Sequence, residues 1–193
     1  MKSNICYFYN ENGIEDVLDE IEKTARYCGF SNKQTLQLRL LSEELIGMIQ
    51  VMKSEFEGQF WIETGIDSCD LHMLMDVLFE DDEIKDELKN IAEINKKSKS
   101  LVGDIYEFIV NVMAGKKART LKPNSPMVRA SFTGLGTVNW SLSSYKRVLN
   151  ETGNSDEIDF LDKSIIGKLS DDILLSTRDN QVELIIKKDF YNE

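Results

Sequence analysis

Two kinds of hydrophobic spacing follow one another in the N-terminal part of the chain, and this change constrains the fold more than any other feature. Apolar residues repeat at helical intervals over 14–28 and again over 31–53, which predicts two amphipathic helices. Over 59–66 and 70–78 apolar and polar residues alternate instead, with a turn at Asp67-Ser68 between the two segments. Such alternation is typical of a hairpin with one covered face. We therefore expect helices to cover one face of this hairpin.

Local signals mark the boundary between the two helices. Gly29 follows the last apolar residue of the first helix and is expected to end it. Ser31 is a natural N-cap for the second helix, and Gln34 stands three residues later as in a capping box.

The rest of the chain continues with helices and strands. Strands are predicted over 5–9, 173–176 and 182–186, and helices over 81–94, 98–115, 140–149 and 158–169. Residues 115–136 hold both prolines and are expected to form a loop. The 193 residues suit a single domain over 1–193, with 80–150 as a helical, lid-like insertion. The predicted class is α+β, a two-layer α/β sandwich whose mixed sheet is covered on one face by helices.

The formal net charge of −11 limits the classes of partner. Non-specific binding of nucleic acid needs phosphate neutralisation by Lys and Arg, so we exclude a nucleic-acid partner. A protein partner with a basic patch is favoured instead. Cationic residues do gather in the middle of the chain, where they form either a solvated face or an anion-facing insertion: Lys96, Lys97, Lys99, Lys116, Lys117, Arg119, Lys122 and Arg129.

Composition also bears on location and on metal chemistry. No apolar run reaches the roughly 18 residues of a membrane span, and the N-terminus lacks a secretory segment, so we predict a cytoplasmic protein without a membrane partner. The three cysteines, Cys6, Cys28 and Cys69, are widely spaced, which favours free thiols over a disulfide framework or a zinc site. The single histidine, His72, lies in an alternating apolar run and is given a structural role. We assign no metal ligand.

The helical stripe over 38–49 is interrupted by two adjacent carboxylates, Glu43 and Glu44. It resembles the helix that supplies the catalytic Glu and the magnesium-binding Asn in GHKL-type ATPases, the group of gyrase, sensor histidine kinases, MutL-like proteins and anti-sigma kinases. In the small anti-sigma kinases the order is Ser-Glu, three residues, then Asn. Here Ser42-Glu43 fits this order, and Gly47 stands at the Asn position.

The order of predicted elements extends the resemblance to the Bergerat, or GHKL, sandwich over 5–79 and 158–190. The segments 140–143 and 161–165 are also similar to a group of uncharacterised bacterial ATP-binding-type proteins. The resemblance implies ATP or ADP as ligand, with Glu43 or Glu44 as the catalytic carboxylate. Gly47 has no side chain with which to coordinate Mg²⁺.

The other family motifs are matched in part. Asp76 stands where the family Asp receives the adenine amino group, whereas Leu78 and Glu80 replace the two glycines that follow. Gly134 and Gly136 are the candidates for the glycine-rich phosphate loop. Ser98-Lys99-Ser100 precedes an apolar helix, so Lys99 and Ser100 belong either to an N-cap or to an anion site. Taken separately, Glu43-Glu44 also fits a solvated pair and Asp76 a turn residue.

These residues leave two function classes open. The first is a degenerate, pseudo-ATPase or nucleotide-binding regulatory module that acts through protein–protein interaction in bacterial signalling. The second is an active anti-sigma-type serine or histidine kinase, or a weak ATPase. Trp140 and Tyr145 are candidate anchors for a regulator or sigma-like partner, since Trp and Tyr dominate hot spots, or they pack internally. A homodimer is compatible with both classes.

Overall fold

The computed structural model describes residues 1–10, 12–50, 56–77, 90, 105, 109–110, 131–132, 138–153, 158, 161, 164–178 and 181–190. The predicted helices over 81–94 and 98–115 lie largely outside these residues. The helical positions described there are Asn90, Ile105, Ile109 and Val110, and the last three are buried in the core.

The described strands form one seven-stranded sheet in the order β1-β2-β3-β7-β6-β5-β4. Their bounds are β1 Cys6–Tyr9, β2 Phe56–Thr64, β3 Ser68–Val77, β4 Ser131–Phe132, β5 Val138–Ser141, β6 Asp172–Arg178 and β7 Gln181–Asp189. Every pairing among them is antiparallel, so the predicted mixed sheet is wrong. The cause is local: β2–β3 and β6–β7 are hairpins, and β7 pairs antiparallel with β3.

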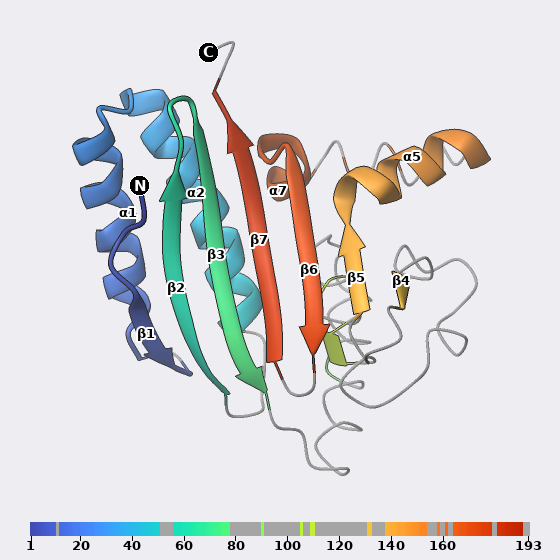
Figure 1. Cartoon of the computed structure of the whole chain (residues 1–193), viewed down its shortest axis with the longest axis horizontal. Coiled ribbons are helices and arrows are strands. Elements are labelled where there is room, and N and C mark those ends of the chain that lie inside the picture. The colour runs from blue at the N-terminus through green and yellow to red at the C-terminus, as the bar shows by residue number, and fades with distance from the viewer. Residues whose placement is uncertain are drawn as a thin grey trace.

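Helices α1 (Ile14–Cys28), α2 (Asn32–Gln50) and α7 (Ile165–Leu169) lie on one side of this sheet, behind it in Figure 1. Helix α5 (Leu142–Thr152) follows β5 directly, and its Lys146 Nζ donates to the carbonyl of Gly167 in α7 at 3.2 Å. The structure is therefore α+β, with helices against one face of an open antiparallel sheet, as the sequence predicts at this level.

The boundary between α1 and α2 confirms the local signals. Gly29 caps α1 in the left-handed conformation with φ 70°, where a side chain would be strained. The backbone N–H of Gln34 donates to Ser31 Oγ at 3.3 Å, and the N–H of Ser31 donates to Gln34 Oε1 at 2.8 Å. These reciprocal bonds form the predicted capping box.

The core fills the space between the helices and the sheet. Along the central strands every second side chain is buried there, among them Phe60, Leu71 and Ile186. Leu38, Leu41 and Leu45 of α2 meet them from the other layer. The side chains at the alternate positions of each strand, including Trp61 and His72, therefore lie on the opposite face of the sheet.

Three predicted elements differ from the structure. The helix predicted over 140–149 begins only at Leu142, because 138–141 pairs with β6 as a strand. The helix predicted over 158–169 is interrupted at Ser164, which is extended (ψ 132°) and accepts a hydrogen bond from the N–H of Gly167. Strands β4 and β5 both fall within 80–150, so this region is not purely helical and contributes to the main sheet.

Candidate functional site

The outer face of α2 carries three of the predicted site residues. Leu38, Leu41 and Leu45 turn the other face of the helix into the core. Glu43 is exposed, and Gly47 follows it by about one helical turn, so the two share the outward side. The structure thus places the Glu43 carboxylate next to Gly47, the position at which the motif that the sequence resembles has Asn.

The Glu43 carboxylate is engaged by a neighbouring cation. Arg39 Nε donates to Glu43 Oε1 at 3.0 Å, and Arg39 Nη1 donates to Glu22 Oε1 on α1 at 2.7 Å. The two carboxylates raise the pKa of the exposed Arg39, and the hydrogen bond to Glu43 makes the largest contribution. Arg39 therefore links α1 to α2, and Glu43 takes part in a surface ion-pair network.

Glu44 differs from its neighbour in solvation. It is half-buried, and burial raises the pKa of its carboxyl group. A raised carboxyl pKa is one property that general acids and bases share. Of the two adjacent carboxylates, Glu44 is the better candidate for chemistry on this ground.

Gly47 has open space around it. Among the described residues, no heavy atom lies within 4 Å of a Cβ built at this position, apart from the local backbone of its own helix. The described residues therefore leave room for a side chain here. Gly47 itself offers no oxygen or nitrogen beyond its helical backbone.

Asp76 lies on the other side of the sheet from α2. On β3 it pairs with Glu57 and Gln181, while its neighbour Met75 is fully buried in the core beneath the helices. Alternation then places Asp76 on the opposite face. The structure does not bring Asp76 together with Glu43, Glu44 or Gly47. The predicted residues Lys99, Ser100, Gly134 and Gly136 lie outside the described residues.

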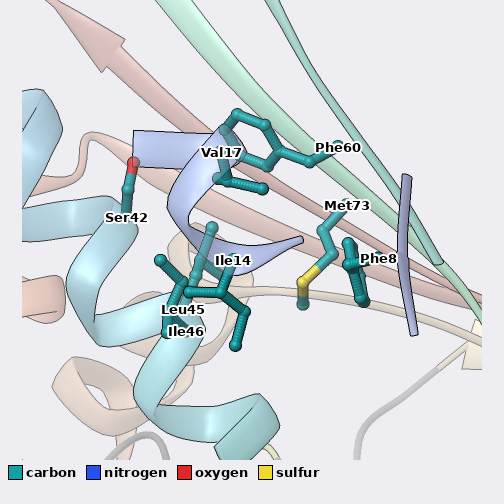
Figure 2. A pocket seen from close by; sticks show the side chains of 8 residues that line it. All are labelled: Phe8, Ile14, Val17, Ser42, Leu45, Ile46, Phe60 and Met73. Atoms are coloured by element: carbon teal, nitrogen blue, oxygen red, sulfur yellow. The ribbon is translucent and has the colours of Figure 1, made fainter. Parts of the chain in front are cut away.

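A small cavity lies between α1, α2 and the sheet (Figure 2). Its volume is about 10 Å³. All but one of the residues that line it are apolar, and the exception is Ser42, whose hydroxyl donates to the carbonyl of Leu38 at 2.8 Å. The lining residues are Phe8, Ile14, Val17, Ser42, Leu45, Ile46, Phe60 and Met73. A cavity of this size has room for about one water and is a packing void, far too small for a nucleotide.

Sequence reasoning missed a group of side chains on the open face of the sheet. The rings of Trp61 and His72 stack with centroids 4.8 Å apart and planes 11° apart, and Lys2 Nζ lies 4.2 Å from the centre of the Trp61 ring. Trp61 Nε1 donates to Glu63 Oε1 at 3.0 Å, which lowers the pKa of Glu63. The sequence did contain a signal for this group. In β2 and β3 one set of alternate residues is apolar and fills the core, and Trp61, His72 and Leu74 belong to the other set, which faces away from the helices.

Trp140 and Tyr145, the candidate anchors for a partner, pack internally. Both side chains are buried, at 6% and 7% exposure, and their rings lie 6.2 Å apart between α5 and the sheet. Neither is available as a surface anchor. The reason is that Trp140 belongs to a strand and pairs with the buried Leu175.

Comparison with protein-family models, curated proteins and solved structures finds no match. Among the described residues, no helix combines the length and the apolar character needed to cross a membrane. Within the same residues, no group of three or more His, Cys, Asp and Glu side chains is arranged to hold a metal ion.

Proposed function

We propose that this chain is a degenerate GHKL-type module that regulates by binding another protein and does not turn over ATP at an appreciable rate. The observation that carries the proposal is the separation of its candidate residues by the sheet. Glu43, Glu44 and Gly47 lie on the helical layer, whereas Asp76 lies on the opposite face. An adenine held by Asp76 would therefore be far from a phosphate positioned by α2.

Two further features of α2 support the loss of turnover. Phosphoryl transfer needs Mg²⁺ to neutralise developing charge, and Gly47 has no side chain for it. Glu43, which the resemblance makes a catalytic base, is paired with Arg39 at 3.0 Å. The hydrogen bond from Arg39 occupies the carboxylate and leaves it less capacity to orient a water.

One observation favours the second candidate, a weak ATPase or anti-sigma-type kinase. Burial raises the pKa of Glu44, and perturbed carboxyl groups concentrate at functional sites. In this reading Glu44 takes the role of base and nucleotide occupies the outer side of α2. Gly47 then leaves the metal to be held by other groups.

Thermal unfolding with ATP or ADP, with and without Mg²⁺, separates the two candidates. A ligand at 100 times its dissociation constant adds about 2.7 kcal/mol, which raises the Tm of a chain of this size by about 5–10 °C. We expect no such rise and no Mg²⁺-dependent phosphate release. A clear rise, together with turnover that Glu44→Gln abolishes and Glu57→Gln leaves intact, would establish the enzyme instead.

A further inference from the structure

The face of the sheet turned away from α1, α2 and α7 is the one toward the viewer in Figure 1. The strand registers place its residues in ordered rows. Each row takes one residue from β2, β3, β7 and β6 in that order. The four rows are Glu63–Asp70–Lys187–Asp172, Trp61–His72–Ile185–Leu174, Gln59–Leu74–Glu183–Ser176 and Glu57–Asp76–Gln181–Arg178. Apolar and aromatic side chains thus form the second row, and charged side chains lie on both sides of it.

The apolar residues of this face are contiguous. We define the sheet-face patch as Tyr7, Trp61, His72, Leu74, Leu174 and Ile185. Leu74 adjoins the second row, and Tyr7 pairs with Gln59 at the next strand. Tyr7 is 67% exposed, and Trp61, Leu74, Leu174 and Ile185 are all partly exposed. A contiguous apolar patch that water reaches marks an interaction surface more often than isolated apolar residues do.

The centre of the patch is ordered before any partner binds. Trp61 is held by its stack on His72, by Lys2 above its ring and by its hydrogen bond to Glu63. A rigid aromatic side chain loses little conformational entropy on binding, which is why Trp is enriched in hot spots. The strands beneath it are paired on both sides, so the platform cannot easily rearrange.

His72 adds a polar group without a partner at the centre of this platform. Its residue exposure is 9%, and neither ring nitrogen has a hydrogen-bond partner among the described residues. Nε2 lies 3.9 Å from Glu63 Oε2, too far for a hydrogen bond. Both ring nitrogens are buried, so a partner meets this part of the patch through the Trp61 ring that stacks on His72, and not through the imidazole nitrogens.

The charges around the patch select its occupant. In the four rows six carboxylates stand against two cations, Lys187 and Arg178. Lys187 Nζ forms an ion pair with Asp70 Oδ2 at 3.9 Å. Lys2, a further cation near the patch, forms one with Glu63, with Nζ 3.8 Å from Oε1. Two copies of this face would bring like charges together, which disfavours a dimer through it. A segment with apolar side chains flanked by Lys or Arg matches both the patch and its surroundings.

We propose that the sheet-face patch is the docking surface for a partner protein, which binds through an apolar segment flanked by lysine or arginine side chains. The proposal rests on the regulatory function proposed above and names its surface. Apolar contact with Trp61, Leu174 and Ile185 holds the segment, and the carboxylates at the ends of the strands attract it. Added salt weakens the complex, mainly by slowing association.

Two charge-reversal variants test the electrostatic part. The probe is a synthetic peptide with a leucine face flanked by lysines, and the control peptide carries glutamate in place of lysine. Glu57→Lys with Glu183→Lys alters the open face, and Glu15→Lys with Asp19→Lys makes the same change of net charge on exposed positions of α1. We expect calorimetry to show about tenfold weaker binding, or about 1.4 kcal/mol, for the first pair and less than about twofold for the second.

The apolar part is tested by Leu174→Ser, with Tyr27→Ser on α1 as control, since Tyr27 is 80% exposed. We expect only Leu174→Ser to weaken binding of the leucine–lysine peptide. Occupation of the patch should also shift the fluorescence of the partly exposed Trp61 to the blue, and Trp61→Phe should remove that shift. Circular dichroism and urea unfolding verify that each variant is folded.

Several outcomes would overturn the docking proposal. They are absence of binding by the leucine–lysine peptide, equal effects of the two charge-reversal pairs, and equal effects of Leu174→Ser and Tyr27→Ser. Self-association of the free protein that Leu174→Ser abolishes would assign the patch to a second copy. These results are independent of the nucleotide test: ATP turnover with peptide binding at the patch would refute the proposed loss of activity alone.

Discussion

Substitution of Gly by Ala should have opposite effects on stability at two positions, Gly47 and Gly58. Gly58 on β2 lies under Phe8, and a Cβ built there would overlap the Phe8 ring and lie 2.9 Å from the carbonyl oxygen of Leu74. Gly47 on α2 has no described heavy atom within 4 Å of such a Cβ, apart from its own local helix backbone. Comparing the two separates the effect of packing from the effect of backbone entropy.

The expected magnitudes follow from these surroundings. Ala in place of Gly within a helix or strand gains about 0.5–1 kcal/mol. At Gly47 this gain is unopposed, so we expect Gly47→Ala to stabilise by about 0.5–1 kcal/mol and to raise the Tm by about 1–4 °C. At Gly58 overpacking costs about 1–3 kcal/mol, because Phe8 is 5% exposed and packs edge-on against Phe56. The net expectation for Gly58→Ala is a loss of about 1–2 kcal/mol.

Urea unfolding, followed by circular dichroism and fluorescence, measures both changes, and unchanged m-values would show that the reference states are the same. The double variant Phe8→Leu with Gly58→Ala should lose less stability than the sum of its two parts, because the smaller side chain vacates the space. Stabilisation by Gly58→Ala, or destabilisation by Gly47→Ala, would refute the packing described around these two positions.

Three further predictions concern the capping box, the thiols and the α2 carboxylates. Ser31→Ala should lower the free energy of unfolding by about 1 kcal/mol in urea titration, because the N–H of Gln34 loses its acceptor. Cys69, fully buried and with its pKa raised by burial, should react with a thiol reagent far more slowly than the partly exposed Cys6 and Cys28, and Cys69→Ala should remove only the slow phase. Burial raises the folded-state pKa of Glu44 above 4.5, so its carboxyl group binds protons more tightly in the folded state and stability falls as pH rises through that window. Glu44→Gln should therefore stabilise near pH 7 and have little effect near pH 4. Glu43→Gln, which breaks the exposed pair with Arg39, should lower the stability only slightly near pH 7.

The sequence predicts those parts of the fold that depend on short-range signals. The first two helices, the β2–β3 hairpin and the capping box each leave a periodic pattern or a paired motif within a few residues. Strand β5 leaves none, since its four residues are held by pairing with β6, more than thirty positions away. The break at Ser164 is equally hidden, because Ile158, Leu161, Ile165 and Leu169 keep helical spacing across it.

The candidate site shows a different limit of sequence reasoning. The resemblance assigns Asp76 and the carboxylates of α2 to one nucleotide site, with Asp76 as the partner of adenine. The alternation of side chains along β3 separates them. Met73 and Met75 point to the helices, so Asp76 points away from them. The same alternation places Trp61, His72 and Leu74 on the open face. Both results follow from the alternation in the sequence once the covered face is known, which the sequence alone does not provide.

The orientation of Asp76 on β3 also connects the proposed function with the proposed docking surface. Of the described residues that resemble a nucleotide site, Asp76 alone lies among the rows of the open face, where it adds to the carboxylates around the patch. On that face a carboxylate attracts a cationic segment, while adenine recognition would require α2 to approach from the same side. Asp76→Asn is therefore expected to weaken the leucine–lysine peptide slightly and to leave the response to ATP unchanged. A nucleotide response that disappears with this isosteric change would place ligand and docking on one face and would contradict the separation on which the regulatory proposal depends.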